Sequence, residues 1–233
     1  MRRVLIAAGI LLASVFCAAQ STAVFASIYA EHAGTLTTDP ENQFWRDAQP
    51  IYAEVDGDGH ALPEYRTEVR SRWTKTDIYF LFVCPYKQLY LKPKPDAEHE
   101  TYELWNWNVA EAFIGSDFKD IHRYKEFEVS PRNEWIDLDI DLHKPHHENG
   151  WVWNSGFEHQ ARIDEPKHVW YAILRIPFSA VDSRPPRAGK AFRVNFYRTD
   201  GSGKDAKEVM WQAVMSRTFH TPERFGVLEL RTK

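Results

Sequence analysis

The chain has 233 residues, with 29 basic and 33 acidic side chains and a formal net charge of −4. This near balance excludes the strong positive field with which a protein attracts nucleic acid or an anionic membrane. The length suits one domain with a substantial core. Aromatic residues make up 14% of the chain, which is typical of proteins that bind through flat apolar surfaces, and also of a tryptophan-rich core.

The first residues have the order of a secretory signal peptide. Met1–Arg3 is basic, Val4–Phe16 is apolar, and small residues follow. About 13 apolar residues are too few to span a bilayer comfortably. We therefore expect a signal peptide over residues 1–23, a single domain over residues 24–233, and a secreted or periplasmic protein without membrane contact after cleavage. An uncleaved anchor is the alternative.

The two cysteines cannot form a disulfide in the mature chain. Cleavage would remove Cys17 and leave Cys84 alone, so the core must supply stability even in an oxidising compartment. Cys84 ends the run Asp77–Cys84, which is apolar on both faces. We expect a buried thiol that behaves as a small hydrophobic side chain.

The body of the chain is a series of short strand patterns separated by turns. In Trp135–Leu142 the Ile and Leu residues alternate with Asp, so we expect the aliphatic face to pack and the Asp face to meet water or a polar ligand. Phe44–Ala48 is expected to be an edge segment, and Tyr86–Tyr102, with its prolines, a long loop. The expected strands are the apolar stretch ending at Ile114, with Arg66–Trp73, Asp77–Cys84, Tyr124–Val129, Trp135–Leu142, Gly156–Ile163, Lys167–Ile176, Ala191–Arg198, Val209–Ala213 and Phe225–Arg231. Strands in this number, with no helix of three turns, predict an all-β fold, an antiparallel β-sandwich that is jelly-roll-like.

Two segments raise the question of metal binding. Asp56 and Asp58 belong to an Asp-Gly-Asp-Gly turn that is similar to the opening of a calcium loop, but the acid that closes an EF-hand is out of register. The loop 143–150 contains three histidines and a glutamate, which suggests zinc, yet their spacing matches no standard motif. At the first segment a plain turn is favoured and structural calcium is the less favoured alternative. At the second a solvated surface loop is expected.

An ordered set of motifs runs from about residue 40 to residue 231. Its segments are Trp45-Arg46-Asp47-Ala48, Trp73 before Ile78-Tyr79-Phe80, Trp105 six residues before Glu111, Tyr124 to Pro131, Arg175-Ile176-Pro177, Phe192 to Phe196 and Phe225 to Leu228. This set resembles family 9 carbohydrate-binding modules. The family is a β-sandwich that occurs beside xylanases and as free-standing secreted proteins. Its site holds a terminal sugar between two tryptophans, with polar side chains on the hydroxyls and calcium in a structural part.

By position, the resemblance implies a clamp formed by Trp105 and Trp211, with Glu111 between them as the acid that binds hydroxyls. Arg132 is a weaker match to a basic contact. The ligand implied is a xylan-like or glucan-like plant polysaccharide or oligosaccharide, in support of carbohydrate catabolism. Secondary contacts are expected from Trp107, Asn195 and Arg198, while the long proline loop departs from compact family members and leaves the shape of the pocket open.

Chemistry favours the same reading. An indole stacks on the C–H face of a pyranose, and charged groups bind its hydroxyl rim. One alternative is intrinsic glycoside hydrolysis, which needs two carboxylates facing each other across the bond, whereas the carboxylates here project side by side. Another is a haem or redox sandwich with Met210 and a histidine as ligands. The remaining alternatives are a tryptophan core without a ligand site and a structural envelope protein with a degenerate site.

Overall fold

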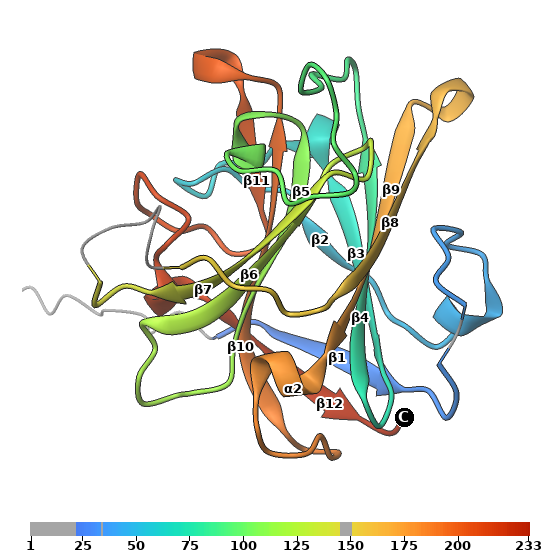
Figure 1. Ribbon diagram of the computed structural model, residues 1–233, viewed down its shortest axis with the longest axis vertical. Helices are drawn as coiled ribbons and strands as arrows, with labels where there is room; N and C mark the ends of the chain where they lie inside the picture. The colour runs from blue at the N-terminus through green and yellow to red at the C-terminus, as the bar shows by residue number, and fades with distance from the viewer. Residues whose placement is uncertain (1–21, 34, 145–150) are drawn as a thin grey trace, which may run out of the picture.

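The computed structural model describes residues 22–33, 35–144 and 151–233 (Figure 1). The expected signal peptide and most of the histidine-rich loop lie outside these residues. The strands are β1 (Val24–Tyr29), β2 (Ile51–Ala53), β3 (Thr67–Trp73), β4 (Asp77–Pro85), β5 (Val109–Gly115), β6 (Arg123–Val129), β7 (Trp135–Asp141), β8 (Glu158–Asp164), β9 (Val169–Pro177), β10 (Ala191–Asp200), β11 (Lys207–Met210) and β12 (Gly226–Arg231). Between them lie one short α-helix, α2 (Phe178–Val181), and the 3-10 turns η1 (Gln43–Trp45), η2 (Pro63–Tyr65), η3 (Leu104–Asn106), η4 (Glu165–Lys167), η5 (Gly203–Asp205) and η6 (Pro222–Arg224).

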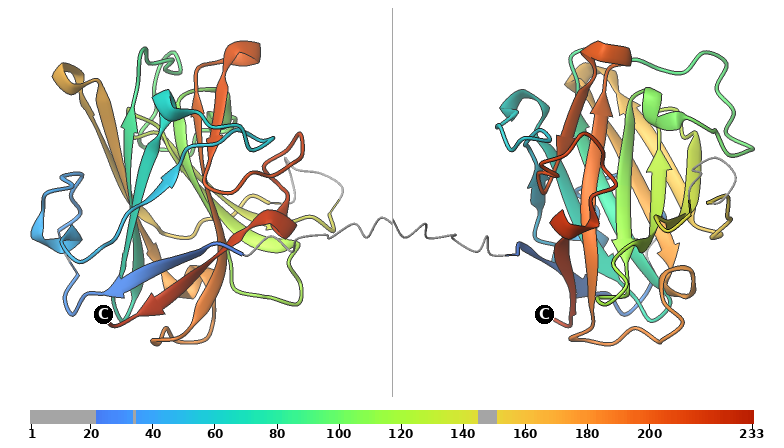
Figure 2. Two further views of the ribbon diagram at one scale, coloured as in Figure 1. Left: turned by 180° about the vertical axis from the view of Figure 1, so that it is seen from behind. Right: turned by 90° about the vertical axis from the view of Figure 1, so that its left-hand side faces the viewer.

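The twelve strands form one continuous sheet that folds over into a sandwich of two leaves (Figure 2). One leaf has the order β7-β6-β5-β10-β12, with β11 paired to β10. The other has the order β3-β4-β9-β8, with β2 paired to β3. The all-β sandwich predicted from the sequence is therefore confirmed.

Strand β1 joins the two leaves and is the exception to the antiparallel pattern. It pairs in parallel with β12, with Val24 opposite Val227, and in parallel with β3, with Ile28 opposite Arg72. At this strand the sheet departs from the antiparallel pairing expected from the sequence. Because β1 and β12 lie at opposite ends of the chain, no hairpin turn sets their relative direction.

The main core fills the space between the leaves and is rich in phenylalanine. Phe196 on β10 meets Phe80 on β4 edge to face, with ring centroids 5.0 Å apart, and meets Phe25 on β1 at 5.7 Å. Cys84 lies fully buried in this core, and burial raises the pKa of its thiol to about 12. The prediction of a buried, unreactive thiol is confirmed.

Both outer faces of the sandwich are also covered. Trp45, which is fully buried, packs with Tyr79, Leu81 and Ile173 on the outer face of β4 and β9. The segment around it, expected to be an edge segment, contains the 3-10 turn η1. A second cluster covers the outer face of β5, β6 and β10 and includes Phe113 and its neighbours, and this is where the candidate site lies.

The two faces of β7 differ from the simple expectation of one packed and one wet face. Ile136, Leu138 and Ile140 are buried in the outer cluster, as predicted. Asp137, however, is fully buried as well, because the backbone N–H and the hydroxyl of Ser155 both donate to its Oδ2. The segment that follows the histidine-rich loop therefore covers this face at Asp137, whereas the side chain of Asp139 is 47% exposed, as expected for a face that meets water.

Within the residues that the structure describes, no helix has both the length and the apolar character needed to cross a membrane.

Candidate functional site

A pocket opens on the outer face of the first leaf, above β5, β6 and β10. Its volume is about 350 Å³, inside the range of about 300 to 1,000 Å³ typical of small-molecule sites. The floor is built by strand residues and the rim by η3, β11 and the segment that precedes η6. The lining residues are Trp105, Glu111, Phe113, Glu126, Thr199, Glu208, Arg217, Thr218, Phe219 and His220.

Two half-buried aromatic rings, Trp105 and Phe219, belong to the lining. Trp105 sits in η3, which is anchored by the fully buried Leu104, and Tyr102 meets the indole edge to face at 5.3 Å. Phe219 stacks on Tyr197 of β10, with centroids 4.4 Å apart and planes within 7°. Both rings are half-buried, so each keeps apolar surface that a ligand could cover.

The proline loop is tied to the pocket by one buried amide. Asn108, just before β5, accepts hydrogen bonds through Oδ1 from the backbone N–H groups of Tyr90 and Gly201, at 2.8 and 3.3 Å. This side chain therefore joins the long loop and the β10–β11 connection to the end of the strand that carries Glu111.

Three buried carboxyl groups lie together beneath the pocket. Glu111 stands directly opposite Glu128 on the neighbouring strand, and Glu126 is on the same face of β6. One oxygen from each lies within 4.8 Å of the other two. Hydrogen-bond partners are missing for Oε1 of Glu111, Oε2 of Glu126 and both oxygens of Glu128 among the described residues. Unsatisfied buried acceptors of this kind are rare in folded proteins.

Burial is the shared cause of the raised pKa values of these three carboxyl groups. Desolvation, together with the neighbouring carboxylates, raises the pKa of Glu111 and of Glu128 well above the ordinary value. Desolvation raises the pKa of Glu126 to about 7. Near neutral pH the group therefore retains protons, and a protonated carboxyl can donate a hydrogen bond to its neighbour or to a ligand hydroxyl.

His220 connects the floor to the rim. Its Nδ1 lies 2.7 Å from the hydroxyl of Tyr124, its ring stacks on Phe113 with centroids 5.4 Å apart, and its Nε2 is 4.0 Å from Oε2 of Glu126. Desolvation raises the pKa of the Tyr124 phenol, so this phenol remains protonated, and it donates to Nδ1 or accepts from it according to the imidazole tautomer. These contacts fix the position of the segment that carries Phe219.

The structure separates the two tryptophans that were expected to form a clamp. Trp105 belongs to the outer cluster, whereas Trp211 packs against the main core, 6.2 Å from Phe25 and 6.0 Å from Phe196. Gly226 lies under this indole so closely that an added Cβ would stand 2.4 Å from the ring. The two indoles therefore do not face each other, because Trp211 pairs with the inward-facing Phe196 through its backbone N–H.

Two polar residues expected at the ligand instead serve the scaffold. The amide of Asn195 is buried and donates to the hydroxyl of Tyr197, which in turn donates to the carbonyl of Phe219, at 2.9 and 3.0 Å. Asn195 thus supports the pocket wall from behind. Arg198 is fully buried on the inward side of β10 and pairs with Asp200 and the hydroxyl of Thr67.

The other two predicted contacts lie outside the pocket lining. Arg132 is exposed in the turn between β6 and β7, where its backbone N–H donates to Ser130. Trp107 is half-buried just after η3. Of the residues expected at the ligand, the structure brings together Trp105 and Glu111.

Several lining residues were not predicted as ligand contacts. Glu126 could have been found, because the alternation in Tyr124–Val129 puts it on the same sheet face as Glu111 once β5 and β6 are paired. Phe219 and His220 had no such signal, since they belong to an irregular segment whose path depends on the packing of the whole leaf.

The turn at Asp56 is closed by its own hydrogen bonds. Oδ1 of Asp56 accepts from the backbone N–H groups of Asp58 and His60, at 3.0 and 2.8 Å, and Oδ2 lies 3.2 Å from Nδ1 of His60. Asp58 is exposed. Both Asp56 oxygens are thus engaged within the turn, which is a poor start for a calcium cage of six to eight oxygens.

A β-sandwich with an aromatic-rimmed, acid-floored pocket on one leaf has the architecture of a small ligand-binding module. Residues 39–233 match the family described as carbohydrate family 9 binding domain-like. Because the match covers most of the chain, the protein belongs to that family.

A curated relative and several solved structures are similar to the chain at low sequence identity. A protein of Arthroderma benhamiae named "Extracellular protein" is 24% identical over 137 residues, which are 53% of this chain and 60% of the relative. The chain thus matches well under two thirds of that protein's length. A candidate carbohydrate-binding protein from Bacteroides uniformis is 14% identical, with a TM-score of 0.70, over 91% of this chain and 100% of that one.

A family 9 carbohydrate-binding module from Caldicellulosiruptor kristjanssonii has a similar fold. Its complex with cellotriose has a TM-score of 0.64 at 11% identity, over 91% of this chain and 95% of that one. Its complex with glucose has a TM-score of 0.65 at 12% identity, over 91% and 97%. At these identities the similarity establishes the fold, and the ligands belong to that module.

Proposed function

We propose that the protein is a secreted carbohydrate-binding module that holds a sugar in the pocket between Trp105 and Phe219. The observation that carries this proposal is the pairing of apolar ring faces at the rim with the buried carboxyls of Glu111 and Glu126 at the floor. A pyranose has the same division, with C–H faces that stack on aromatic rings and hydroxyls that bind carboxyl groups. The ligand class proposed is a neutral glucan-like or xylan-like oligosaccharide.

Protonation suits this floor to a neutral ligand. With their pKa values raised by burial, Glu111 and Glu126 can act both as donor and as acceptor toward hydroxyl groups. A hydroxyl that supplies the missing partner of Oε1 of Glu111 would remove the cost of an unsatisfied buried acceptor, about 1 to 3 kcal/mol. Exposed Arg217 and Glu208 at the rim offer further polar contacts.

Replacing Trp105 with alanine should weaken sugar binding by about thirtyfold, near 2 kcal/mol, because the stacking surface is lost. Isothermal titration calorimetry with cellotriose, glucose and xylotriose measures this change. Trp107→Ala is the matched control, since this indole is close in sequence but does not line the pocket. Trp211→Ala measures whether the inward-facing indole contributes to sugar affinity. Equal affinities of the Trp105 and Trp107 variants for the sugar bound by the wild type would refute the proposed site.

Hydrolysis is the competing function, because two acids with raised pKa values are present. Glu111 and Glu126 rise from the same face of one sheet, so both reach a ligand from the same side, whereas glycosidases place theirs across the bond. A reducing-sugar assay on xylan and glucan tests this, and steady release of sugar that Glu111→Gln abolishes would establish an enzyme.

A haem-binding sandwich is the other alternative. Met210 does not line the pocket that contains His220, so these two side chains do not form a ligand pair there. Absorbance of the purified protein near the Soret band is the test.

The proposal also includes export of the protein and a role in carbohydrate catabolism. The basic, apolar and small-residue order at the N-terminus supports cleavage near residue 23 and a secreted or periplasmic location. N-terminal sequencing of the exported protein tests the cleavage site. A module of this kind would hold an enzyme or a cell near its polysaccharide.

Structural calcium at Asp56 and Asp58 is a separate, weaker proposal. Calcium would have to displace His60 from Asp56, because both Asp56 oxygens are engaged in the turn. A rise in melting temperature on adding calcium, lost in Asp58→Asn, would support a site there. No change in melting temperature with calcium or a chelator would remove it.

A further inference from the structure

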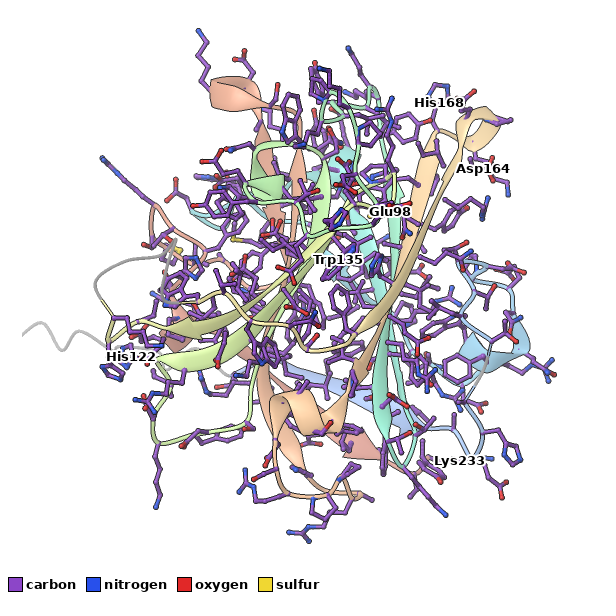
Figure 3. The ribbon with its side chains drawn as sticks, viewed as in Figure 1. Glu98, His122, Trp135, Asp164, His168 and Lys233 are labelled. Carbon is purple, nitrogen blue, oxygen red and sulfur yellow. The ribbon has the colours of Figure 1, made fainter. Side chains whose placement is uncertain are left out.

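A cluster of metal-ligating side chains lies at the edge of the first leaf, outside the sugar pocket. It brings together Asp120 and His122, just before β6, and His143, just after β7. One ligand atom from each of these residues lies within 4.8 Å of the other two. Figure 3 labels His122 at the margin of the molecule, where β6 begins. None of the three residues lines the pocket.

A fourth side chain, from another segment, lies beside His122 but is not one of the three residues whose ligand atoms are mutually within 4.8 Å. Oε1 of Glu223, in η6, lies 3.4 Å from Nε2 of His122. Nε2 of His143 lies 3.1 Å from Oδ1 of Asp120. The four groups thus come from three loops that are far apart in sequence but adjacent at this edge.

Two of the six separations fit a tetrahedral site, and Glu223 would have to move closer to Asp120 and His143 to complete it. With metal bonds of about 2.0 to 2.1 Å to nitrogen and oxygen, neighbouring ligand atoms of a tetrahedron stand about 3.3 Å apart. The two measured pairs, 3.4 and 3.1 Å, are close to this value. The two imidazole rings, with centroids 5.4 Å apart and planes at 61°, are edge-on rather than stacked, so their nitrogens can turn toward one point.

The surrounding charges are mixed and leave one Asp120 oxygen for the metal. Nε of Arg123 pairs with Oδ2 of Asp120 at 3.3 Å and with Asp141 at 3.7 Å, and Lys144 lies 4.0 Å from Asp141. These cations oppose a metal, but Arg123 also orients Asp120 so that Oδ1 points to His143. The Arg123 side chain therefore holds the Asp120 carboxylate in place, as hydrogen-bond partners of metal-binding carboxylates commonly do.

We infer that Asp120, His122, His143 and Glu223 form a site for a divalent first-row transition metal, with Zn²⁺ as the ion to test. Two neutral imidazoles and two carboxylates are a donor set that zinc accepts readily. The ion would connect the loop before β6, the end of β7 and η6. It would thereby brace the segment that leads from Phe219 into η6, while its binding does not depend on whether the pocket holds a sugar.

Calorimetric titration of the purified, metal-stripped protein with zinc chloride at pH 7.5 should show saturable binding of one ion. Single His122→Ala and His143→Ala variants should each weaken it about tenfold or more, because each removes one of four ligands. His99→Ala is the matched control, since this exposed histidine also pairs with an aspartate, Asp96, but stands outside the cluster. Zinc should also raise the melting temperature of the wild type and of His99→Ala, but not of His122→Ala.

Two results would overturn the inference. One is the absence of saturable zinc binding to the wild type at pH 7.5. The other is zinc affinity in His122→Ala and His143→Ala equal to that of the control, which would assign the ion to other histidines. Both substituted histidines are at least 40% exposed, with side chains at 43% and 55%, and circular dichroism checks that each variant is folded.

Discussion

Replacing Arg198 with methionine is expected to destabilise the protein by about 3 to 5 kcal/mol, because it leaves the partner of a buried ion pair without its countercharge. Arg198 is fully buried and Asp200 is 6% exposed. Desolvation raises the pKa of Asp200 even though Arg198 opposes this. Without the guanidinium, Asp200 must be buried either charged or protonated, and Thr67 loses a donor.

Urea denaturation of Arg198→Met and of an Arg132→Met control measures the effect. The exposed Arg132 should change the free energy of unfolding by less than about 0.5 kcal/mol. An Arg198→Met, Asp200→Leu double variant should recover much of the loss, because the unpaired charge is removed with its partner. A stable Arg198→Met protein that has lost only sugar affinity would contradict this result and return Arg198 to the ligand site.

Glu128→Gln is expected to stabilise the protein at pH 8 by about 2 kcal/mol or more, since an uncharged amide replaces a carboxyl that is costly to ionise. Glu128 is fully buried, and within the described part of the chain its oxygens have no hydrogen-bond partner outside the carboxyl cluster. Repulsion from the ionised forms of Glu111 and Glu126 adds to desolvation in raising the pKa of Glu128.

The sign of the pH dependence follows from the raised pKa values. The folded protein binds more protons than the unfolded chain wherever a carboxyl pKa is higher in the folded state, so stability falls as pH rises. For Glu126 this fall begins near the ordinary value of 4.5 and continues to about 7, with a contribution on the order of 3 kcal/mol. Glu111 and Glu128 extend it to higher pH.

Melting temperatures between pH 5 and pH 9 test both statements. The wild type should lose stability steadily over this range, and Glu128→Gln should show a shallower loss. Glu41→Gln, at an exposed position, is the matched control and should follow the wild-type curve. A wild type that is equally stable at pH 5 and pH 9 would mean that the three carboxyls already have a permanent countercharge, such as a bound cation.

The architecture was readable from local patterns because strand period and turn residues are local properties. The alternation in Tyr124–Val129 and the double-sided apolar run in Asp77–Cys84 correspond to β6 and β4. Strand β1 was missed, since it follows directly on the expected leader and has no turn to mark its partner. Its parallel pairing with β12 depends on chain ends that meet only in the folded state.

The candidate site was predicted in part for the same reason. Trp105 and Glu111 are six residues apart, with Trp105 just before β5 and Glu111 within it. Their closeness in space therefore follows largely from their closeness in sequence. Trp211 was assigned to the same place by its order in the chain, but which face of the sheet it occupies depends on its pairing with Phe196. A shift of one residue in strand register reverses the face of every side chain, and order in the sequence does not reveal that register.

Sequence alone determined the all-strand class, the family resemblance, the isolated buried thiol and the presence of aromatic and acidic residues suited to a sugar. Tertiary structure decided which of them meet: it buried Arg198 and Asn195 in the scaffold, turned Trp211 inward, and gathered Glu126, Phe219 and His220 around Trp105 and Glu111. The physical reason is that hydrophobicity and strand period act over a few residues, whereas a pocket is made by segments that become neighbours only when two leaves close over a common core.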